Sequence, residues 1–85
     1  MRRRVRRIKI RGEKWRIVIA RPPQNFCDAL CCYNERTIYI RPTADLTRCV
    51  VHEILHAACP DLSEEAVEEL EDAICTGLEI CAAMQ

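Results

Sequence analysis

The chain has 85 residues, and its 13 basic and 13 acidic side chains give a formal net charge of zero. Hydrophobic residues make up 49%, and there are only 2 glycines and 4 prolines, which excludes a disordered tail or a low-complexity linker. A chain of this length has room for one domain, here residues 1–85, with one small core. Because only 5% of the residues are aromatic, that core must be mainly aliphatic.

The charges are unevenly distributed along the chain. Residues 1–21 contain ten basic residues and one acid, Glu13, whereas residues 61–85 contain eight acids and no base. Runs of charge usually form solvated faces, but they also serve contacts with nucleic acid or between molecules. The opposite charges at the two ends would suit head-to-tail contacts between copies.

No targeting segment is evident. The basic start is not followed by an apolar run of about 7–15 residues, and no stretch is long enough to span a bilayer. We therefore expect a cytoplasmic protein with no membrane contact. In a reducing cytosol its seven cysteines would be buried hydrophobes or free thiols, although hyperthermophiles do form intracellular disulfides.

Residues 1–21 predict a β-hairpin. The segments 5–11 and 14–20 alternate apolar and polar residues, and Gly12-Glu13 between them is typical of a short turn. Isoleucines and Trp15 fall on one face of this hairpin and basic residues on the other. The hairpin should therefore have one buried and one basic face.

A third strand is predicted over residues 36–41, with Ile38 and Ile40 pointing inward and Pro42 ending it. The preceding residues 26–35 hold three cysteines and predict an irregular or short helical connection.

Two helices are expected after the strands. Thr43 is a good N-cap for a helix over residues 44–58, and Ser63 is the predicted N-cap of a second helix over residues 63–82. The second helix carries an apolar stripe at helical spacing that consists of Ala66, Leu70, Ala73, Ile74, Gly77 and Cys81. The order β-β-β-α-α predicts an α+β domain with helices packed on a small antiparallel three-stranded sheet. A tight turn between the helices would place Cys49 opposite Cys75, which predicts a disulfide between them.

The strongest functional signal is "HEILH", residues 52–56, which contains both histidines of the chain. On a helix, His52 and His56 lie one turn apart on the same face, so both can bind one metal ion. Glu53 would lie beside the ion and act as a general base of a zinc peptidase. The alternative is a pair of surface histidines on an amphipathic helix.

The third ligand would decide the class of site. A metzincin needs a glycine and a histidine where this chain has Cys59 and Leu62, so that class is excluded. Cys59 itself is a candidate that would suit a structural zinc site. Glutamates at the start of a helix are favoured by the macrodipole alone, so most of the remaining candidates are expected to be surface residues; they are Glu64, Glu65, Glu68 and Glu69.

The segment "TIYIRPTADLTRCVVHEILHAACPDLSEEAVEEL", residues 37–70, resembles the short gluzincin-type zinc metallopeptidases, the minigluzincin-like and SprT-like proteins. The similarity covers roughly residues 30–75. It implies a zincin-like fold in which an edge strand, Thr37–Arg41, pairs with an extended peptide substrate. The chain departs from that family because no separate helix precedes the strands and much of the usual substrate-binding wall is missing.

The resemblance also implies a zinc ion held by His52, His56 and a glutamate of the next helix. In that family a small residue follows the ligand glutamate directly and apolar residues follow further on, a pattern that Glu65 fits and Glu64 does not. Glu65 is therefore the predicted third ligand, and Glu69 is a candidate for orienting a ligand histidine.

Three residues are candidate donors to the transition state: Tyr33, Tyr39 and Arg41. Both tyrosines are more commonly packing residues.

The sequence thus predicts a zinc-dependent metallopeptidase. The first alternative is a non-catalytic binding module in which a cysteine closes the coordination of a structural zinc. The second is a protein that contacts nucleic acid through the arginine-rich hairpin, with an affinity that falls steeply with salt. Because the basic stretch lacks interleaved aromatic residues, stacking on single strands is not expected.

Overall fold

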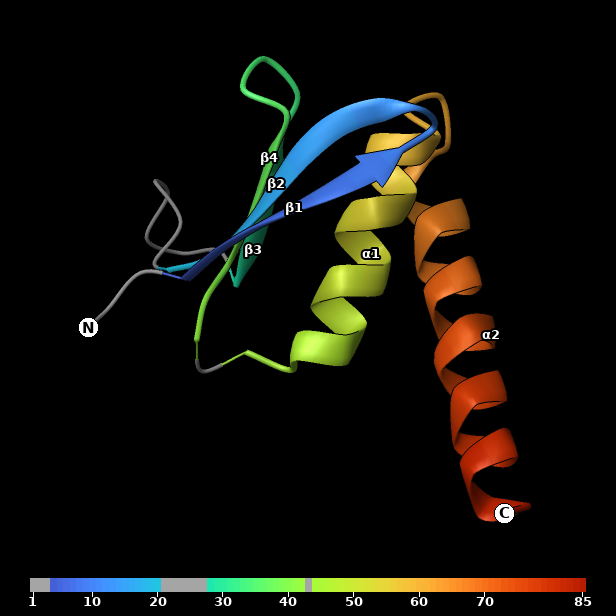
Figure 1. Ribbon diagram of the computed structural model, residues 1–85. Helices are drawn as coiled ribbons and strands as arrows, with labels where there is room; N and C mark the ends of the chain where they lie inside the picture. The colour runs from blue at the N-terminus through green and yellow to red at the C-terminus, as the bar shows by residue number, and fades with distance from the viewer. Residues whose placement is uncertain (1–3, 21–27, 43) are drawn as a thin grey trace.

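A computed structural model describes residues 4–20, 28–42 and 44–85, which form a four-stranded sheet followed by two helices. The elements are β1 (Arg4–Ile10), β2 (Glu13–Ile19), β3 (Ala29–Cys32), β4 (Thr37–Ile40), α1 (Leu46–Ala58) and α2 (Glu64–Ala83). They are arranged in layers, with α1 between the sheet and α2 (Figure 1). The predicted α+β class is confirmed.

The hairpin of β1 and β2 is confirmed, with a turn one residue earlier than predicted. Arg11 and Gly12 have positive φ angles of 51° and 80°, the left-handed conformation that matches the twist of a two-residue hairpin turn. Ile8 pairs with Trp15, so the isoleucines of both strands and Trp15 share the face that α1 covers, whereas Val5 and Val18 pair on the opposite face.

The sheet is mixed, so the prediction of three antiparallel strands is wrong. The strand order is β1-β2-β4-β3; β2 and β4 run parallel, and the other two pairs are antiparallel. The additional strand β3 lies in the segment predicted to be irregular, because its four apolar residues without alternation cannot be told from a buried helical segment by pattern alone. As a result β4 has a neighbour on both sides, and the expectation that residues 37–41 form an edge strand is also wrong.

The core lies between the sheet and α1. Four buried residues form its centre: Ile10, Trp15, Ile38 and Ile40. The inward direction predicted for Ile38 and Ile40 is confirmed, since neither is accessible to solvent. From α1, Val50, Ile54 and Ala57 pack against this centre. Each fully buried isoleucine contributes about 1.5–3 kcal/mol to stability. Packing against these residues determines which face of α1 turns toward the sheet.

Both helices begin at side-chain caps. The α1 helix begins after Asp45, whose Oδ1 accepts a hydrogen bond from the Arg48 backbone N–H at 3.2 Å. The predicted start was two residues earlier, and the predicted cap, Thr43, lies outside the described residues. Ser63 is confirmed as the α2 cap, because its Oγ accepts a hydrogen bond from the Ala66 N–H at 3.1 Å.

The predicted apolar stripe of α2 faces solvent rather than the core. Leu70 and Ile74 are 41% and 40% exposed, whereas Val67 and Cys75 are the buried residues of this helix. Among the described elements α2 packs only against α1, so a narrow strip of its surface is covered. Its C-terminal half extends beyond the rest of the domain (Figure 1).

The predicted disulfide between Cys49 and Cys75 is wrong, since both residues are free thiols. Neither α1 nor α2 has the length and apolar character needed to cross a membrane.

Candidate metal centre

His52 and His56 lie on the face of α1 that turns toward α2. Their Nε2 atoms are 3.2 Å apart and their ring centroids 4.8 Å apart. The two rings therefore converge on one point, as the spacing of four residues on a helix predicts.

The carboxylate that reaches these rings belongs to Glu64, the first residue of α2. Its Oε1 lies 2.6 Å from Nε2 of His52, and its Oε2 lies 3.1 Å from Nε2 of His56. Within the described ranges, these three residues form a group whose ligand atoms all lie within 4.8 Å of one another, close enough to hold a metal ion.

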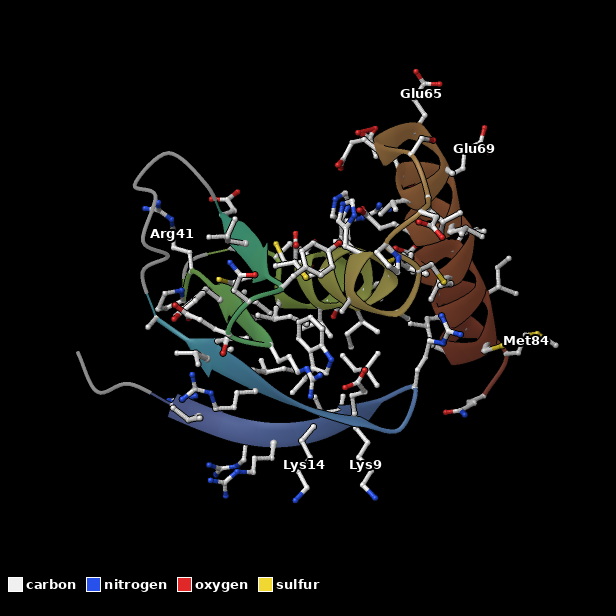
Figure 2. All side chains as sticks on the ribbon, turned by 90° about the horizontal axis from the view of Figure 1, so that it is seen from above. Lys9, Lys14, Arg41, Glu65, Glu69 and Met84 are labelled. Carbon is white, nitrogen blue, oxygen red and sulfur yellow. The ribbon has the colours of Figure 1, made fainter. Side chains whose placement is uncertain are left out.

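The structure does not bring Glu65, the predicted third ligand, to the histidines. Glu65 and Glu69 point away from α1 and from the rest of the domain (Figure 2). Successive residues of a helix are rotated by about 100°, so only one of two neighbouring glutamates can face α1. Glu68 and Cys59 are exposed and lie outside the group.

The donor set fits a zinc ion. Two imidazole nitrogens and one carboxylate oxygen are zinc ligands at about 2.0–2.2 Å, and tetrahedral bonds of that length place the ligand atoms roughly 3.3 Å apart. The separation of the two Nε2 atoms, 3.2 Å, is close to that value. The distances to Glu64 involve its two oxygens, 2.6 Å from His52 to Oε1 and 3.1 Å from His56 to Oε2, and with one oxygen as ligand all three ligand atoms lie within 4.8 Å of one another. The same donors also suit other divalent transition metals, so the site defines the class of ion and not its identity.

Behind His52 lies a second carboxylate that the sequence analysis missed. Nδ1 of His52 is 2.8 Å from Oε1 of Glu71, and Oε2 of Glu71 accepts a hydrogen bond from Nη1 of Arg48 at 2.9 Å. The same Arg48 nitrogen also lies 2.9 Å from Asp72. A carboxylate at Nδ1 fixes the ring orientation and leaves Nε2 to bind a metal.

The roles of Glu71 and Arg48 could have been predicted from their spacing along the two helices. Glu71 lies seven residues after Glu64, which puts it two turns further along the same face of α2. Arg48 lies four residues before His52, one turn earlier on α1. Burial lowers the pKa of His52, but the hydrogen bond to Glu71 and the surrounding carboxylates outweigh it, so the pKa is raised.

Glu53 is the one buried residue of α1, with 8% of its surface exposed. Burial raises the pKa of its carboxyl group, whereas the neighbouring charges of His52 and His56 lower it; the net effect is a raised pKa. Burial leaves the carboxylate poorly solvated and so disfavours its charged form. Glu53 is therefore a stronger base than a carboxylate on the surface.

Of the three candidate donors, Tyr33 is the one on the metal side of the sheet. Its hydroxyl donates a hydrogen bond to the backbone oxygen of His56 at 2.9 Å, and its ring packs edge-to-face with Trp15. Burial raises the pKa of Tyr33, as do the nearby Cys31 and Glu53. Tyr33 thus ties the end of β3 to the α1 helix beside the site.

The other two candidates lie away from the metal group. Tyr39 alternates with the inward isoleucines of β4, so it lies on the face of the sheet opposite α1, where its hydroxyl donates to Glu35 at 2.7 Å. Arg41 forms an ion pair with Asp28 at 3.7 Å and points away from the helices (Figure 2).

Comparison of the chain with protein-family models, with curated proteins and with solved structures gave no match.

Proposed function

We propose that this chain is a minimal zinc-dependent metallopeptidase of the gluzincin type. One observation carries the proposal: His52, His56 and Glu64 converge from two helices, and the buried Glu53 lies on α1 beside the first ligand. The resemblance of residues 37–70 to gluzincins, with their zincin-like fold, supports the same reading.

In this proposal His52, His56 and Glu64 hold the ion, and Glu71 keeps the His52 ring in place. When bound, zinc polarises the substrate carbonyl and lowers the pKa of an attacking water. Glu53 accepts the proton of that water and passes it to the amine that leaves. Its raised pKa suits both steps, because a base is most effective when its pKa approaches the working pH.

The composition of the group favours catalysis over a closed structural site. A structural zinc has four protein ligands, whereas a catalytic zinc has three and keeps one position open. In the part of the chain that the structure describes, no fourth side chain joins His52, His56 and Glu64. Cys59, the cysteine closest in sequence to His56, is exposed at the end of α1.

Because β4 is an interior strand, we place the peptide substrate along β3 instead of residues 37–41. In the four-stranded order β3 is an edge strand, and it packs beside α1. Edge strands present unpaired backbone groups to which an extended peptide can add as a further strand.

The test is peptide hydrolysis by the zinc-loaded protein, measured with casein and with a quenched fluorescent peptide library. Glu53→Gln should retain zinc and lose activity by about 10²–10⁴-fold, the usual contribution of a general base. The exposed Glu69→Gln should retain both. Zinc binding by the wild type without any hydrolysis would refute catalysis and support the binding-module alternative.

A further inference from the structure

The face of the β1–β2 ribbon that points away from α1 carries four exposed basic side chains. Ile8, Ile10 and Trp15 point toward α1, so the residues that alternate with them point the other way. In the antiparallel register Arg7 lies opposite Arg16, and Lys9 lies opposite Lys14. Figure 2 shows Lys9 and Lys14 on the side of the ribbon away from the helices.

These four side chains, the basic ribbon face, have no acidic partner among the described residues. The ion pairs found there involve Arg36, Arg41, Arg48 and the two histidines. The acid-rich α2 lies on the far side of α1 from the sheet, so it does not neutralise the ribbon (Figure 1).

The arrangement is unfavourable in the isolated chain. Like charges directly opposite each other on neighbouring strands destabilise a sheet. Arg16 is partly anchored, because its guanidinium donates two hydrogen bonds to Oγ1 of Thr37 at 3.0 Å and 3.3 Å. Two adjacent like-charge pairs with no internal counter-charge indicate a surface that meets an anionic partner.

We propose that the basic ribbon face binds the phosphate backbone of duplex nucleic acid. The major groove of a duplex admits a two-stranded ribbon, and the hairpin end of β1 and β2 is two-stranded, because β2 pairs with β4 only from Arg16 to Ile19. The strands of such a ribbon are about 4.8 Å apart, with same-face side chains roughly 7 Å apart along each strand. A membrane surface fits less well, because Val5 is the one large exposed hydrophobic residue among the described residues of β1 and β2. The proposal depends on the hairpin alone and not on the metal site.

Four phosphate contacts make a quantitative prediction. Each contributes about −0.9 to the slope of log affinity against log salt, so the slope should be roughly −3.6. Affinity would then fall by about 10²-fold between 50 mM and 200 mM salt.

The experiment is fluorescence anisotropy with a labelled mixed-sequence DNA duplex of about 20 base pairs at several salt concentrations. Replacing both Lys9 and Lys14 by serine should halve the slope, so that the same salt interval costs only about tenfold. The matched control replaces Arg4 and Arg6 by serine. It removes the same charge from the opposite face of β1, and it should leave the slope nearly unchanged.

Several results would overturn the proposal. One is the absence of duplex binding by the wild type at 50 mM salt. Another is an Arg4 and Arg6 variant that weakens binding as much as the Lys9 and Lys14 variant does.

Two further results would assign the basic ribbon face to another partner. Salt-sensitive self-association in sedimentation experiments without duplex binding would assign it to the acidic α2 of a second copy. Binding to phosphatidylserine vesicles without binding to the duplex would assign it to a membrane surface. The Lys9 and Lys14 variant should not have a lower melting temperature than the wild type, because it removes a like-charge pair, and thermal unfolding of both variants checks that they are folded.

Discussion

Nδ1 of His52 and Oε1 of Glu71 lie 2.8 Å apart, which joins the two helices of the domain behind the candidate metal group. Glu71 is held in turn by Arg48, so the orientation of one histidine depends on a residue that cannot itself reach the ion. The metal group is therefore positioned by α2 twice, through Glu64 and through Glu71.

Replacing Glu71 by glutamine should weaken zinc binding by about 10–100-fold, the usual effect of losing a carboxylate behind a ligand histidine. Glutamine keeps the shape and one acceptor oxygen, so the change isolates the negative charge. Competition with a chromophoric chelator measures the affinity. Glu69→Gln, an exposed change on the same helix, is the control and should have no effect; equal losses in the two variants would contradict the role of Glu71.

Glu64→Ala should abolish the stabilisation of the protein by zinc, whereas the neighbouring Glu65→Ala should preserve it. At a zinc concentration 100 times the Kd, binding stabilises a protein by about 2.7 kcal/mol, which corresponds to roughly 10–20 °C in the melting temperature of so small a domain. Thermal unfolding with and without zinc measures the difference. If Glu65→Ala abolished the stabilisation by zinc and Glu64→Ala preserved it, Glu65 would be the third ligand.

In the absence of metal, stability should decrease as the pH rises through the raised pKa of His52. Because the folded state holds the proton on His52 more tightly than the unfolded chain does, this stabilisation is complete below about pH 6.5 and disappears above the folded pKa. The raised pKa of Glu53 acts in the same direction from about pH 4.5 upward.

Zinc affinity should show the opposite dependence, since His52 must release its proton to bind the ion. Urea unfolding of the zinc-free protein and chelator competition, both between about pH 5 and 8.5, test the two trends. Parallel rather than opposite trends would show that His52 is not the titrating ligand.

The histidine pair of the site was easier to predict from the sequence than the glutamate that α2 turns toward it. The spacing of His52 and His56 determines their convergence, because it depends on helix geometry alone. The choice between Glu64 and Glu65 depends on the rotation of α2 relative to α1, which no local pattern contains. Family resemblance selected Glu65, whereas the structure brings Glu64 to the rings.

The sheet shows a similar division between local and tertiary information. The hairpin of β1 and β2 follows from alternation and a turn, both of which are local. The four residues of β3 show no alternation, and their strand conformation depends on pairing with β4. Without β3 the sequence could not show that β4 is an interior strand.

The outward stripe of α2 gives a stability prediction. Val67→Ala should lower the free energy of unfolding by about 1.5–3 kcal/mol, because Val67 is fully buried. Leu70→Ala removes a larger side chain but should cost less than about 1 kcal/mol, since Leu70 is 41% exposed. Chemical denaturation of the two variants provides the comparison. A greater loss of stability for Leu70→Ala than for Val67→Ala would mean that the apolar stripe of α2 is buried.

The cysteines should differ in reactivity by position. Burial, together with the charge of Glu53, raises the pKa of Cys31 to about 11, so little thiolate is present near neutral pH. Cys59 and Cys81 are exposed. Timed alkylation with iodoacetamide followed by mass spectrometry should label these two before Cys31. Labelling of Cys31 at the rate of Cys59 would contradict its placement.

In the proposed site two imidazoles and one carboxylate, and no thiolate, hold the metal ion. X-ray absorption of the zinc-loaded protein tests it directly, because zinc–sulfur bonds of about 2.3 Å are distinguished from zinc–nitrogen and zinc–oxygen bonds of about 2.0–2.2 Å. We predict a shell of nitrogen and oxygen atoms alone, with two imidazole signatures, one of which is lost in His52→Ala and the other in His56→Ala. A sulfur atom in that shell would contradict it.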